Sequence, residues 1–368
     1  MLVRRLDKAA RWPTEDDPNP FLRYRTLLAA HARAEDDAQY VDVVRRLDGS
    51  VAEVDGKGFS ATPLRFFDDL DVWVKDETGN VGGSHKGRHL MGLAIWLDVV
   101  SMDHERPLAI ASCGNAAIAA SVIARAAGRP LTVYVPTWAD DSVVSRLRDR
   151  GAAIEVCPRR DDDPPGDPCV HRFREAVAAG AIPFSCQGPD NGLTIDGGRT
   201  LAYELVDAGL VVDEVVVQVG GGALASSVSQ GFAEATALGR LAVPPRLHVV
   251  QAEAQAPMVR AWQRRRPAWR AHRSELMWPW EPPGTSVATG ILDDEAYDWA
   301  AVLDGLEGTG GTAVTVTEDD LLRAHTRAHD VTGLDVSPTG SAGLAGFVAL
   351  RDAGTIAPTS SAAVLFTG

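Results

Sequence analysis

A lysine that could act as a nucleophile follows a Gly-Gly-Ser-His segment and occupies position 86. The pattern predicts a strand around Val74, a glycine-containing turn, and a helix that starts around His85. The positive end of the helix dipole disfavours an ammonium there, and a neutral amine is what Schiff-base chemistry needs. For an isolated lysine, a solvated side chain in the first turn is the commoner explanation. Few amines compete with Lys86, because the other lysines are only Lys8, Lys57 and Lys75.

Three consecutive glycines, Gly220, Gly221 and Gly222, follow the apolar run 214–219 and open a predicted helix. Backbone N–H groups at such a junction can bind a phosphate, and glycine lets the backbone approach the anion closely. The run also satisfies the G-x-G-x-x-A pattern of dinucleotide-binding proteins, with Glu253 at the end of the next strand. A nicotinamide-dependent enzyme and a tight packing turn without a ligand are therefore alternatives to a phosphate loop.

A third segment, Ser112-Cys113-Gly114-Asn115, lies between the predicted strand 108–111 and an alanine-rich helix. Its hydroxyl, thiol and backbone donors could bind a carboxylate, and the Asn115 amide could bind a ring oxygen. The same residues would also serve as an ordinary helix N-cap.

Together, Gly-Ser-His-Lys ahead of a helix, Ser-x-Gly-Asn, Gly-Gly-Gly and a terminal Thr-Gly resemble the fold-type II pyridoxal phosphate enzymes. This group contains threonine synthase, serine/threonine dehydratase and the tryptophan synthase β subunit. The resemblance covers residues 62–368 and is carried by the order and spacing of the four motifs. It implies pyridoxal 5'-phosphate as cofactor, a small amino-acid substrate and a homodimer.

The resemblance also implies a role for each matching residue. Lys86 matches the lysine that forms the internal aldimine, and His85 matches a histidine near the cofactor phosphate. Asn115 matches the asparagine at the pyridine 3′-oxygen, and Thr367 matches the hydroxyl residue that faces the ring nitrogen. The substrate carboxylate loop would be Ser112, Cys113 and Gly114, and the phosphate loop would be Gly220, Gly221, Gly222, Ala223 and Leu224.

The chain departs from the family pattern at two positions. Gly87 stands where threonine synthases often have an acidic residue, and Ser337 begins a segment where many relatives have Glu-Pro. A hydroxyl such as Thr367 can hydrogen-bond a neutral ring nitrogen, which suits elimination and replacement better than transamination. We therefore expect β-elimination or β-replacement on a serine- or threonine-like amino acid.

The principal alternative is threonine synthase chemistry on O-phosphohomoserine, which needs basic groups for the substrate phosphate. The basic residues near Lys86 and the helix at 200 are Arg88, His89 and Arg199. A nicotinamide dehydrogenase is disfavoured because it gives no role to Lys86 or to the Ser112 segment. A cofactor-carrying protein without turnover stays open, because most of these motifs would bind cofactor rather than substrate.

Short β-branched runs alternate with alanine-rich helical stretches along the chain. This rhythm predicts α/β architecture with two doubly wound parallel-sheet lobes and the site in the cleft between them. The resemblance implies a large cofactor-binding domain of residues 1–88 and 190–368 and a small domain of residues 89–189. The expected strands lie around residues 72–74, 108–111, 131–135, 153–156, 182–185, 214–219 and 247–250.

The composition is that of a globular protein of 368 residues with a formal net charge of −14. Such a charge disfavours nucleic acid and anionic membranes as partners. The four cysteines form no Cys-x-x-Cys pair, and no stretch of about 18 apolar residues occurs. We therefore expect a cytoplasmic protein with reduced thiols, without an export signal or a membrane span.

Two other features could carry chemistry but have simpler explanations. His325 and His329 have the i, i+4 spacing of metal ligands, yet no third ligand is evident, so we expect no metal. The arginine- and tryptophan-rich segment 262–283 resembles a nucleic-acid stacking surface, but the net charge favours a lid or a dimer contact.

Overall fold

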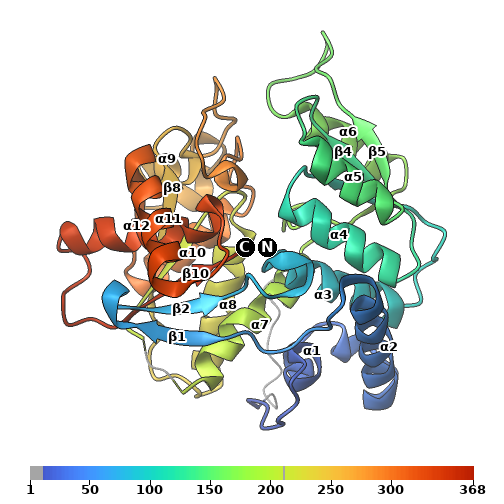
Figure 1. The fold of residues 1–368 in the computed structure, drawn as a ribbon, viewed down its shortest axis with the longest axis horizontal. Helices are drawn as coiled ribbons and strands as arrows, with labels where there is room; N and C mark the ends of the chain where they lie inside the picture. The colour runs from blue at the N-terminus through green and yellow to red at the C-terminus, as the bar shows by residue number, and fades with distance from the viewer. Residues whose placement is uncertain (1–10, 210–211) are drawn as a thin grey trace. The chain divides into compact units, whose positions relative to one another are not determined.

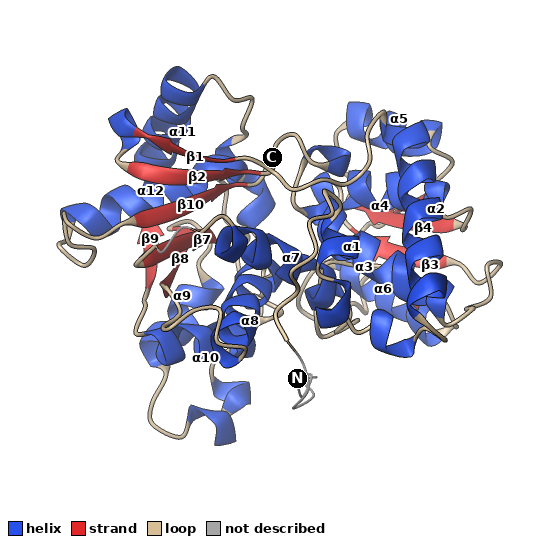
Figure 2. Cartoon of the chain, turned by 90° about the horizontal axis from the view of Figure 1, so that it is seen from below, coloured by secondary structure: helices blue, strands red, loops and turns tan. Residues whose placement is uncertain are grey.

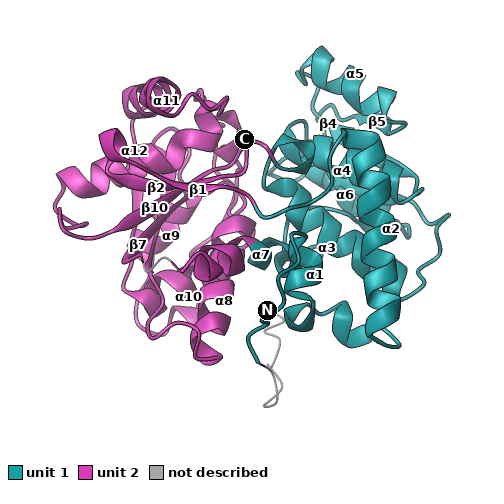
Figure 3. Ribbon diagram, turned by 60° about the horizontal axis from the view of Figure 1, so that its bottom comes forward, with its two compact units in different colours: residues 1–61, 80–200 teal, residues 62–79, 201–368 magenta. Residues whose placement is uncertain are grey.

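The computed structural model describes residues 11–209 and 212–368 and divides the chain into two compact α/β units (Figure 3). Unit 1 contains residues 1–61 and 80–200, and unit 2 contains residues 62–79 and 201–368. The unit boundaries therefore fall at 61/62, 79/80 and 200/201. The division of this chain into a large domain of residues 1–88 and 190–368 and a small domain of residues 89–189 stays a prediction.

Unit 1 is built on a four-stranded sheet with the order β5-β4-β3-β6, in which every pairing is parallel. Leu108 and Ile110 pack in one core with residues of the helix α4, whereas Ala109 packs with Phe173 of the helix α6. Alternate residues of β3 thus face helices on opposite sides, so the sheet is doubly wound, as the sequence predicts. The strands are β3 (Leu108–Ala111), β4 (Leu131–Val135), β5 (Ala153–Val156) and β6 (Ile182–Pro183).

The helices of unit 1 pack closely where glycines meet. A Cβ atom at Gly82 would lie 3.0 Å from the Cα of Ala119 in α4, and one at Gly92 would lie 2.8 Å from the Cα of Gly197. The helices are α1 (Pro20–Arg23), α2 (Asp37–Asp55), α3 (Lys86–Val99), α4 (Asn115–Ala126), α5 (Asp141–Asp149) and α6 (Pro168–Ala178). The helix α7 (Thr194–Asp207) contains the boundary between the units, and short 3-10 turns are η1 (Arg25–Leu27), η2 (His31–Arg33) and η4 (Val81–Gly83).

Unit 2 is built on a six-stranded sheet with the order β1-β2-β10-β7-β8-β9 (Figures 1 and 2). The edge strand β1 is antiparallel to β2, and all other pairings are parallel. The strand closest to the end of the chain, β10, lies between β2 and β7 in the middle of the sheet. The strands are β1 (Leu64–Phe67), β2 (Val72–Asp76), β7 (Glu214–Gln218), β8 (Arg246–Ala252), β9 (Ala313–Val316) and β10 (Ala362–Phe366).

The helix α12 covers the face of this sheet that carries Val216, Val250 and Val364. A Cβ atom at Gly346 of α12 would lie 2.7 Å from the Cβ of Val250, so glycine is what lets this helix approach the sheet. The helices are α8 (Ala223–Ala237), α9 (Pro257–Arg264), α10 (Trp299–Thr309), α11 (Glu318–Thr332) and α12 (Pro338–Asp352), with 3-10 turns η3 (Asp68–Leu70), η5 (Trp269–Ala271), η6 (Arg273–Glu275) and η7 (Thr289–Ile291).

All seven expected strands are present, which confirms the predicted α/β rhythm. The strands β1, β9 and β10 were not expected from the sequence. Those at the edges, β1 and β9, have four residues each and are partly exposed, so their apolar signal is weak. In the described ranges no helix is both long and apolar enough to span a bilayer. None of the four cysteines, all within the described ranges, forms a disulfide.

A buried ion pair ties β2 to α7 inside unit 2. The Lys75 ammonium donates to Glu204 Oε2 at 2.6 Å and to the Thr62 carbonyl at 2.6 Å. The Lys75 and Glu204 side chains are 2% and 4% exposed, so the ammonium has little water to replace a lost partner. The buried Lys75 ammonium therefore depends on the Glu204 carboxylate to balance its charge.

We predict that Glu204→Gln lowers the free energy of unfolding by roughly 3 kcal/mol, because it leaves the buried Lys75 ammonium without its anion. Denaturant unfolding measures the loss. Arg323→Gln, which removes the exposed pair with Asp320, serves as control and should change stability by less than about 1 kcal/mol. Equal losses in the two variants would contradict the prediction.

Candidate active site

Lys86 is the first residue of α3, as the sequence predicts, and it is partly buried. Its backbone N–H donates to Ser84 Oγ at 3.3 Å, and the N–H of Gly87 donates to the Ser84 carbonyl. Ser84 thus fixes the turn that leads into the helix. Lys86 therefore lies in the first turn of α3, at the amino end of that helix.

The other lysines are poorly placed as nucleophiles. Lys75 is buried in its ion pair with Glu204, Lys57 is exposed in the loop after α2, and Lys8 lies outside the described residues. Lys86 is therefore the best candidate among the described lysines.

The residue after the lysine has no room for a side chain. A Cβ atom at Gly87 would lie 2.7 Å from the Val81 carbonyl oxygen and 3.3 Å from the Phe59 ring. The acidic residue common at this position in threonine synthases therefore does not fit this backbone. Close packing against Val81 and Phe59 thus explains why this chain has glycine at position 87.

Two histidines accompany Lys86 on unit 1. His85 is buried at the N-cap of α3, and its ring meets that of His89 edge to face at 5.8 Å between centroids. The His89 Nδ1–H donates to the Thr194 carbonyl at 2.8 Å. Burial, reinforced by the charge of Lys86, lowers the pKa of His89 to about 3, so this imidazole is neutral at pH 7.

The two arginines considered for a substrate phosphate are held by the protein. The Arg88 guanidinium is buried and donates to Thr200 Oγ1 at 3.0 Å. The buried Arg199 guanidinium forms an ion pair with Asp196. Of the three candidates, His89 is neutral and Arg199 is paired with an anion, whereas Arg88 keeps its charge, because the Thr200 hydroxyl is a neutral partner.

The Ser112 segment leads from β3 into α4 with Gly114, not a polar side chain, at the N-cap. No side chain of a described residue caps this helix, so the simple N-cap interpretation of the segment is wrong. Ser112 Oγ accepts the Gly114 N–H at 3.4 Å, which leaves the hydroxyl proton for another acceptor. Cys113 and Asn115 are partly buried in the same turn.

The glycine loop of unit 2 is the junction between β7 and α8. Gly222 has φ of 93° and forms the N-cap of α8 without a side-chain bond. Among residues 11–209 and 212–368, no acceptor bonds the N–H groups of Gly221, Gly222 or Ala223. Such N–H donors at a helix N-terminus can bind a phosphate, and the Asp293 carboxylate beside Gly220 would have to turn away to admit one.

The need for glycine here also has a packing explanation. Cβ atoms at Gly220 and Gly221 would lie 2.3 Å from Asp293 Oδ2 and 3.1 Å from the Tyr297 ring, respectively. The Asp298 N–H donates to the Gly221 carbonyl at 2.8 Å, so the segment before α10 is fixed against the loop.

Side-chain capping differs from helix to helix. Six helices have a side chain at the N-cap that accepts a first-turn N–H: Asn19, Asp36, Asp140, Asp167, Thr317 and Ser337. The helices α3, α4, α8, α9 and α10 have no such N-cap bond among the described residues. Of the three at the motifs, α3 has its Lys86 N–H bonded by Ser84 Oγ, whereas the first turns of α4 and α8 can donate to an anionic group.

Thr367 directly follows β10 and is 2% exposed. Its Oγ1 accepts from Gln218 Nε2, the last residue of β7, at 2.9 Å. Sequence reasoning missed Gln218 because its role depends on the neighbouring position of β7 and β10. The parallel pairing of Val364 with Val216 brings the ends of the two strands together.

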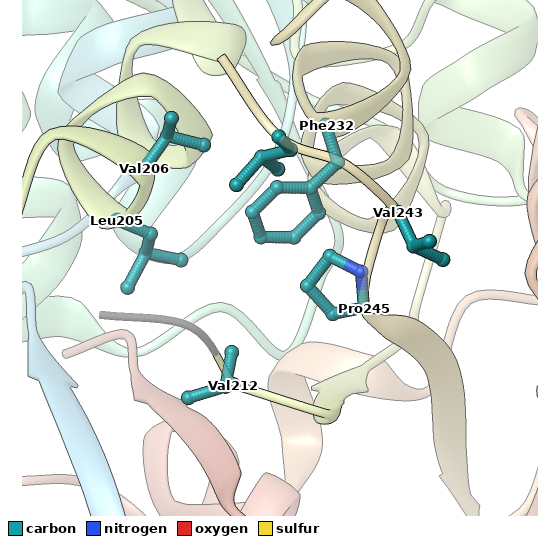
Figure 4. A pocket seen from close by; sticks show the side chains of 7 residues that line it. Leu205, Val206, Val212, Phe232, Val243 and Pro245 are labelled. Carbon is teal, nitrogen blue, oxygen red and sulfur yellow. The ribbon is translucent and has the colours of Figure 1, made fainter. Parts of the chain in front are cut away.

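A small apolar cavity lies elsewhere in unit 2 (Figure 4). Its volume of about 10 Å³ accommodates at most one water molecule, and its lining includes Val212 and Pro245, which precede β7 and β8. It is therefore at the amino edge of the sheet, away from the glycine loop and Thr367.

His325 and His329 lie on α11 with ring centroids 5.0 Å apart. Across the described parts of the chain, no group of three or more metal-binding side chains is present. In the tryptophan-rich segment, Arg260 lies 3.8 Å from the centre of the Trp278 ring and Arg265 lies 3.0 Å from that of Trp262. The chain's own arginines thus stack on these aromatic faces.

The profile of the family described as "Pyridoxal-phosphate dependent enzyme" matches residues 57–368. The chain belongs to this family. The cofactor expected from the resemblance is therefore confirmed as pyridoxal phosphate, and the dinucleotide interpretation of the glycine loop is set aside.

Relatives of this pyridoxal phosphate enzyme include several synthases. Threonine synthase of Methanosarcina acetivorans is 27% identical over 81% of this chain and 69% of its own length. Cysteate synthase of Methanoregula boonei is 29% identical over 70% of this chain and 60% of its own length. Threonine synthase of Mycobacterium tuberculosis is 25% identical over 84% of this chain and 79% of its own length.

Solved structures of the family share the fold. Maize serine racemase aligns with a TM-score of 0.68 and 19% identity over 89% of this chain and 92% of its own. Processed threonine deaminase isoform 2 of Solanum lycopersicum aligns with a TM-score of 0.66 and 16% identity over 91% of each chain. The expected fold-type II architecture is therefore confirmed.

We predict that His89 makes this enzyme less stable in acid. Its pKa rises from about 3 in the folded state to the ordinary 6.5 on unfolding, so only the unfolded chain takes up this proton between those pH values. Acidification below pH 6.5 should lower the free energy of unfolding by up to about 1.4 kcal/mol per pH unit. His89→Asn, whose amide can still donate to Thr194, should remove this slope in denaturant titrations from pH 7 to pH 4.5.

The exposed His272 supplies the control, because His272→Asn should leave the pH slope of the wild-type protein unchanged. A His89→Asn variant with the wild-type slope would contradict the prediction.

Proposed function

We propose that this pyridoxal phosphate enzyme is a lyase or synthase that catalyses β-elimination or β-replacement on a small, serine- or threonine-like L-amino acid. The observation that carries the choice of substrate is the engagement of Arg88 and Arg199 by Thr200 and Asp196, with His89 neutral. Because His89 is neutral and Arg199 is paired with an anion, a substrate phosphate would find little positive charge there beyond the buried Arg88.

The resemblance assigns the residues that would hold the cofactor. Lys86 would bond its aldehyde carbon, and Asn115 would donate to its 3′-oxygen. The loop from Gly220 to Leu224 would bind its phosphate, with His85 beside that group. Thr367 would donate its hydroxyl proton to the ring nitrogen.

When bound, pyridoxal phosphate withdraws electrons from the Cα of the amino acid attached to it. With the cofactor and an amino acid bound, Lys86 Nζ would be the base that takes the Cα proton, and it could pass a proton to the departing β group. The Ser112 hydroxyl and the first-turn N–H groups of α4 bind the substrate carboxylate, with Cys113 and Gly114 forming the same loop. The geometry of α4 supports this, because its positive end lacks a side-chain cap.

Threonine synthase activity on O-phosphohomoserine is the second candidate, and the threonine synthases among the relatives favour it. It requires a binding place for the substrate phosphate and repeated proton transfer toward the γ carbon. The absence of space for an acidic side chain at Gly87 separates this chain from the common threonine synthase pattern. The homodimer and the cytoplasmic location stay predictions that come from the resemblance and the composition.

We predict that the purified protein is yellow and that borohydride reduction fixes the cofactor to Lys86 Nζ. Lys86 is the described lysine that is neither buried in an ion pair nor in an exposed loop. Peptide mapping by mass spectrometry locates the label. Label on Lys75, or on no lysine, would contradict the assignment, and Lys57→Arg should leave the yield of label unchanged.

We predict that serine or threonine yields a 2-oxo acid and that O-phosphohomoserine yields no threonine. The two amino acids and O-phosphohomoserine should be assayed side by side for 2-oxo acid and for inorganic phosphate, with Lys86→Ala as the blank. For β-replacement, a panel of thiol and amine acceptors is added and new amino acids are detected by mass spectrometry. Phosphate release with threonine as product, and no 2-oxo acid from any substrate, would select threonine synthase instead.

A further inference from the structure

A cavity in unit 1 lies where three helices end. Its volume is about 500 Å³, within the range of small-molecule binding sites. The helices are α2, α4 and α5, and their last turns supply most of its lining. The residues from these turns are Glu53, Val54, Arg125, Ala126, Asp149 and Arg150. None of them belongs to the three motifs or to the residues assigned to the cofactor.

Four of these side chains are charged, two with each sign. Glu53 and Asp149 are acidic, and Arg125 and Arg150 are basic. In the described parts of the chain, none of the four forms an ion pair, either with another of the four or with a residue elsewhere. Opposite charges thus line one cavity without neutralising each other, so the cavity can offer both signs to a ligand. Arg150 is partly buried and the other three are exposed, which leaves the cavity open to solvent.

Both guanidinium groups are found at the end of α5. Arg150 Nη1 donates to the Arg146 carbonyl at 3.3 Å, which restrains the Arg150 side chain. A Cβ atom at Gly151 would lie 3.7 Å from Arg125 Nη1, so the Arg125 group lies beside the residue that follows Arg150. Burial lowers the pKa of Arg150, and the charge of Arg146 lowers it further, effects that a bound anion would offset. Guanidinium groups favour carboxylates, because their N–H donors match the two carboxylate oxygens.

The remaining features of the lining favour a cation. The carboxyl end of a helix is the negative end of its dipole, and three such ends meet at this cavity. The Glu53 and Asp149 carboxylates add two full negative charges. A simple anion such as inorganic phosphate would be opposed by these groups, and a simple amine would be opposed by the arginines. A small molecule that carries one charge of each sign matches both kinds of lining group.

We propose that this cavity is a binding site for a small α-amino acid in its zwitterionic form, separate from the candidate active site. The carboxylate would bind the two arginines, and the ammonium would bind the two acidic side chains. Val54 and Ala126 are partly buried and pack on the core of unit 1, so they offer an apolar contact to an aliphatic side chain. The inference does not depend on which reaction the enzyme catalyses.

Asp55 connects the cavity with the turn that leads to Lys86. It is the last residue of α2, two positions after Glu53, and its carboxylate partly offsets the effect of burial on the pKa of Arg150. Asp55 Oδ2 also accepts the Gly82 N–H at 2.9 Å. A ligand carboxylate at Arg150 would compensate the charge of the arginine and leave Asp55 to Gly82. The bound amino acid should therefore make the turn before Lys86 more rigid.

The simpler alternative is that the four charged side chains are merely solvated. Basic residues in the last turn of a helix compensate its negative end, which would account for both arginines without a ligand. This alternative gives no preference for a molecule with two charges. The test therefore compares a zwitterion with fragments that carry only one of its charges.

The first probe is L-valine, which has an aliphatic side chain and no leaving group on its β carbon. Its fragments are 2-methylpropylamine, which lacks the carboxylate, and 3-methylbutanoate, which lacks the ammonium. Each is titrated calorimetrically into holoenzyme reduced with borohydride, because the reduced cofactor cannot take up a substrate amine. We expect L-valine to bind with a dissociation constant on the order of a millimolar, and each fragment to bind at least about tenfold more weakly.

L-alanine and L-leucine are titrated in the same way, so that the result does not depend on one side chain. Failure of all three amino acids to bind would overturn the proposal. A fragment that binds as tightly as L-valine would do the same, because the cavity would then recognise a single charge.

Matched variants locate the bound amino acid. Arg150→Gln should weaken L-valine binding about tenfold, because it removes a charged partner of the carboxylate, and Glu53→Gln should weaken it several-fold. The controls Arg148→Gln and Asp42→Asn remove exposed charges from α5 and α2 outside the cavity and should leave the affinity unchanged. Wild-type affinity in Arg150→Gln would mean that valine binds elsewhere, and the assignment of this cavity would fail.

Hydrogen exchange measures the effect on the turn before Lys86. In the reduced holoenzyme, saturation with L-valine should slow amide exchange roughly threefold in the peptide that contains Gly82. This effect should be lost in Arg150→Gln at the same concentration of L-valine. Unchanged exchange in the wild-type protein, despite binding, would overturn the connection through Asp55 and leave the binding site itself standing.

Discussion

The pairing of β10 between β2 and β7 is the constraint on which the chemistry of unit 2 depends. Because the three strands are parallel, their carboxyl ends meet at one edge of the sheet. Thr367 and the glycine loop both begin where a paired strand ends. Their positions are thus set by backbone hydrogen bonds in the middle of a sheet, which tolerate little displacement. The close approach of α12, made possible by Gly343 and Gly346, completes this arrangement from one face.

In unit 1, helix packing rather than strand pairing fixes the position of the site residues. The turn before Lys86 packs on α4 through Gly82 and Ala119, so the start of α3 is tied to the second turn of α4. The start of α4 has no side-chain cap among the described residues, whereas Ser84 Oγ accepts the Lys86 N–H at the start of α3. Within this unit Arg199 is paired with Asp196, Arg88 donates to the Thr200 hydroxyl, and His89 is neutral at pH 7.

The sequence alone predicted the strand-helix rhythm and helices that start around His85, Ala116 and Leu224, each one residue from the observed start. Each of these starts combines a strong apolar run with glycine or a polar turn. The edge strands were missed because four half-exposed residues give little periodicity. Gln218 could not be found, since a lone glutamine at a strand end gains meaning only from the neighbour that the register supplies. The hydrogen-bond partners of Arg88 and Arg199 could not be predicted either. A position close to Lys86 in the sequence does not show which side chain a guanidinium will contact.

The crowding at Gly87 bears on how the substrate range of such an enzyme can change over generations. Trimming the Phe59 ring would open one side of the space, but the Val81 carbonyl belongs to the backbone and no point substitution removes it. An acidic side chain after the lysine thus becomes accessible only to a lineage that first rebuilds the turn at residues 81–83. Several substitutions would be needed in this turn before an acidic residue at position 87 could be accommodated. Changes of substrate in descendants of this chain should therefore arise at other positions.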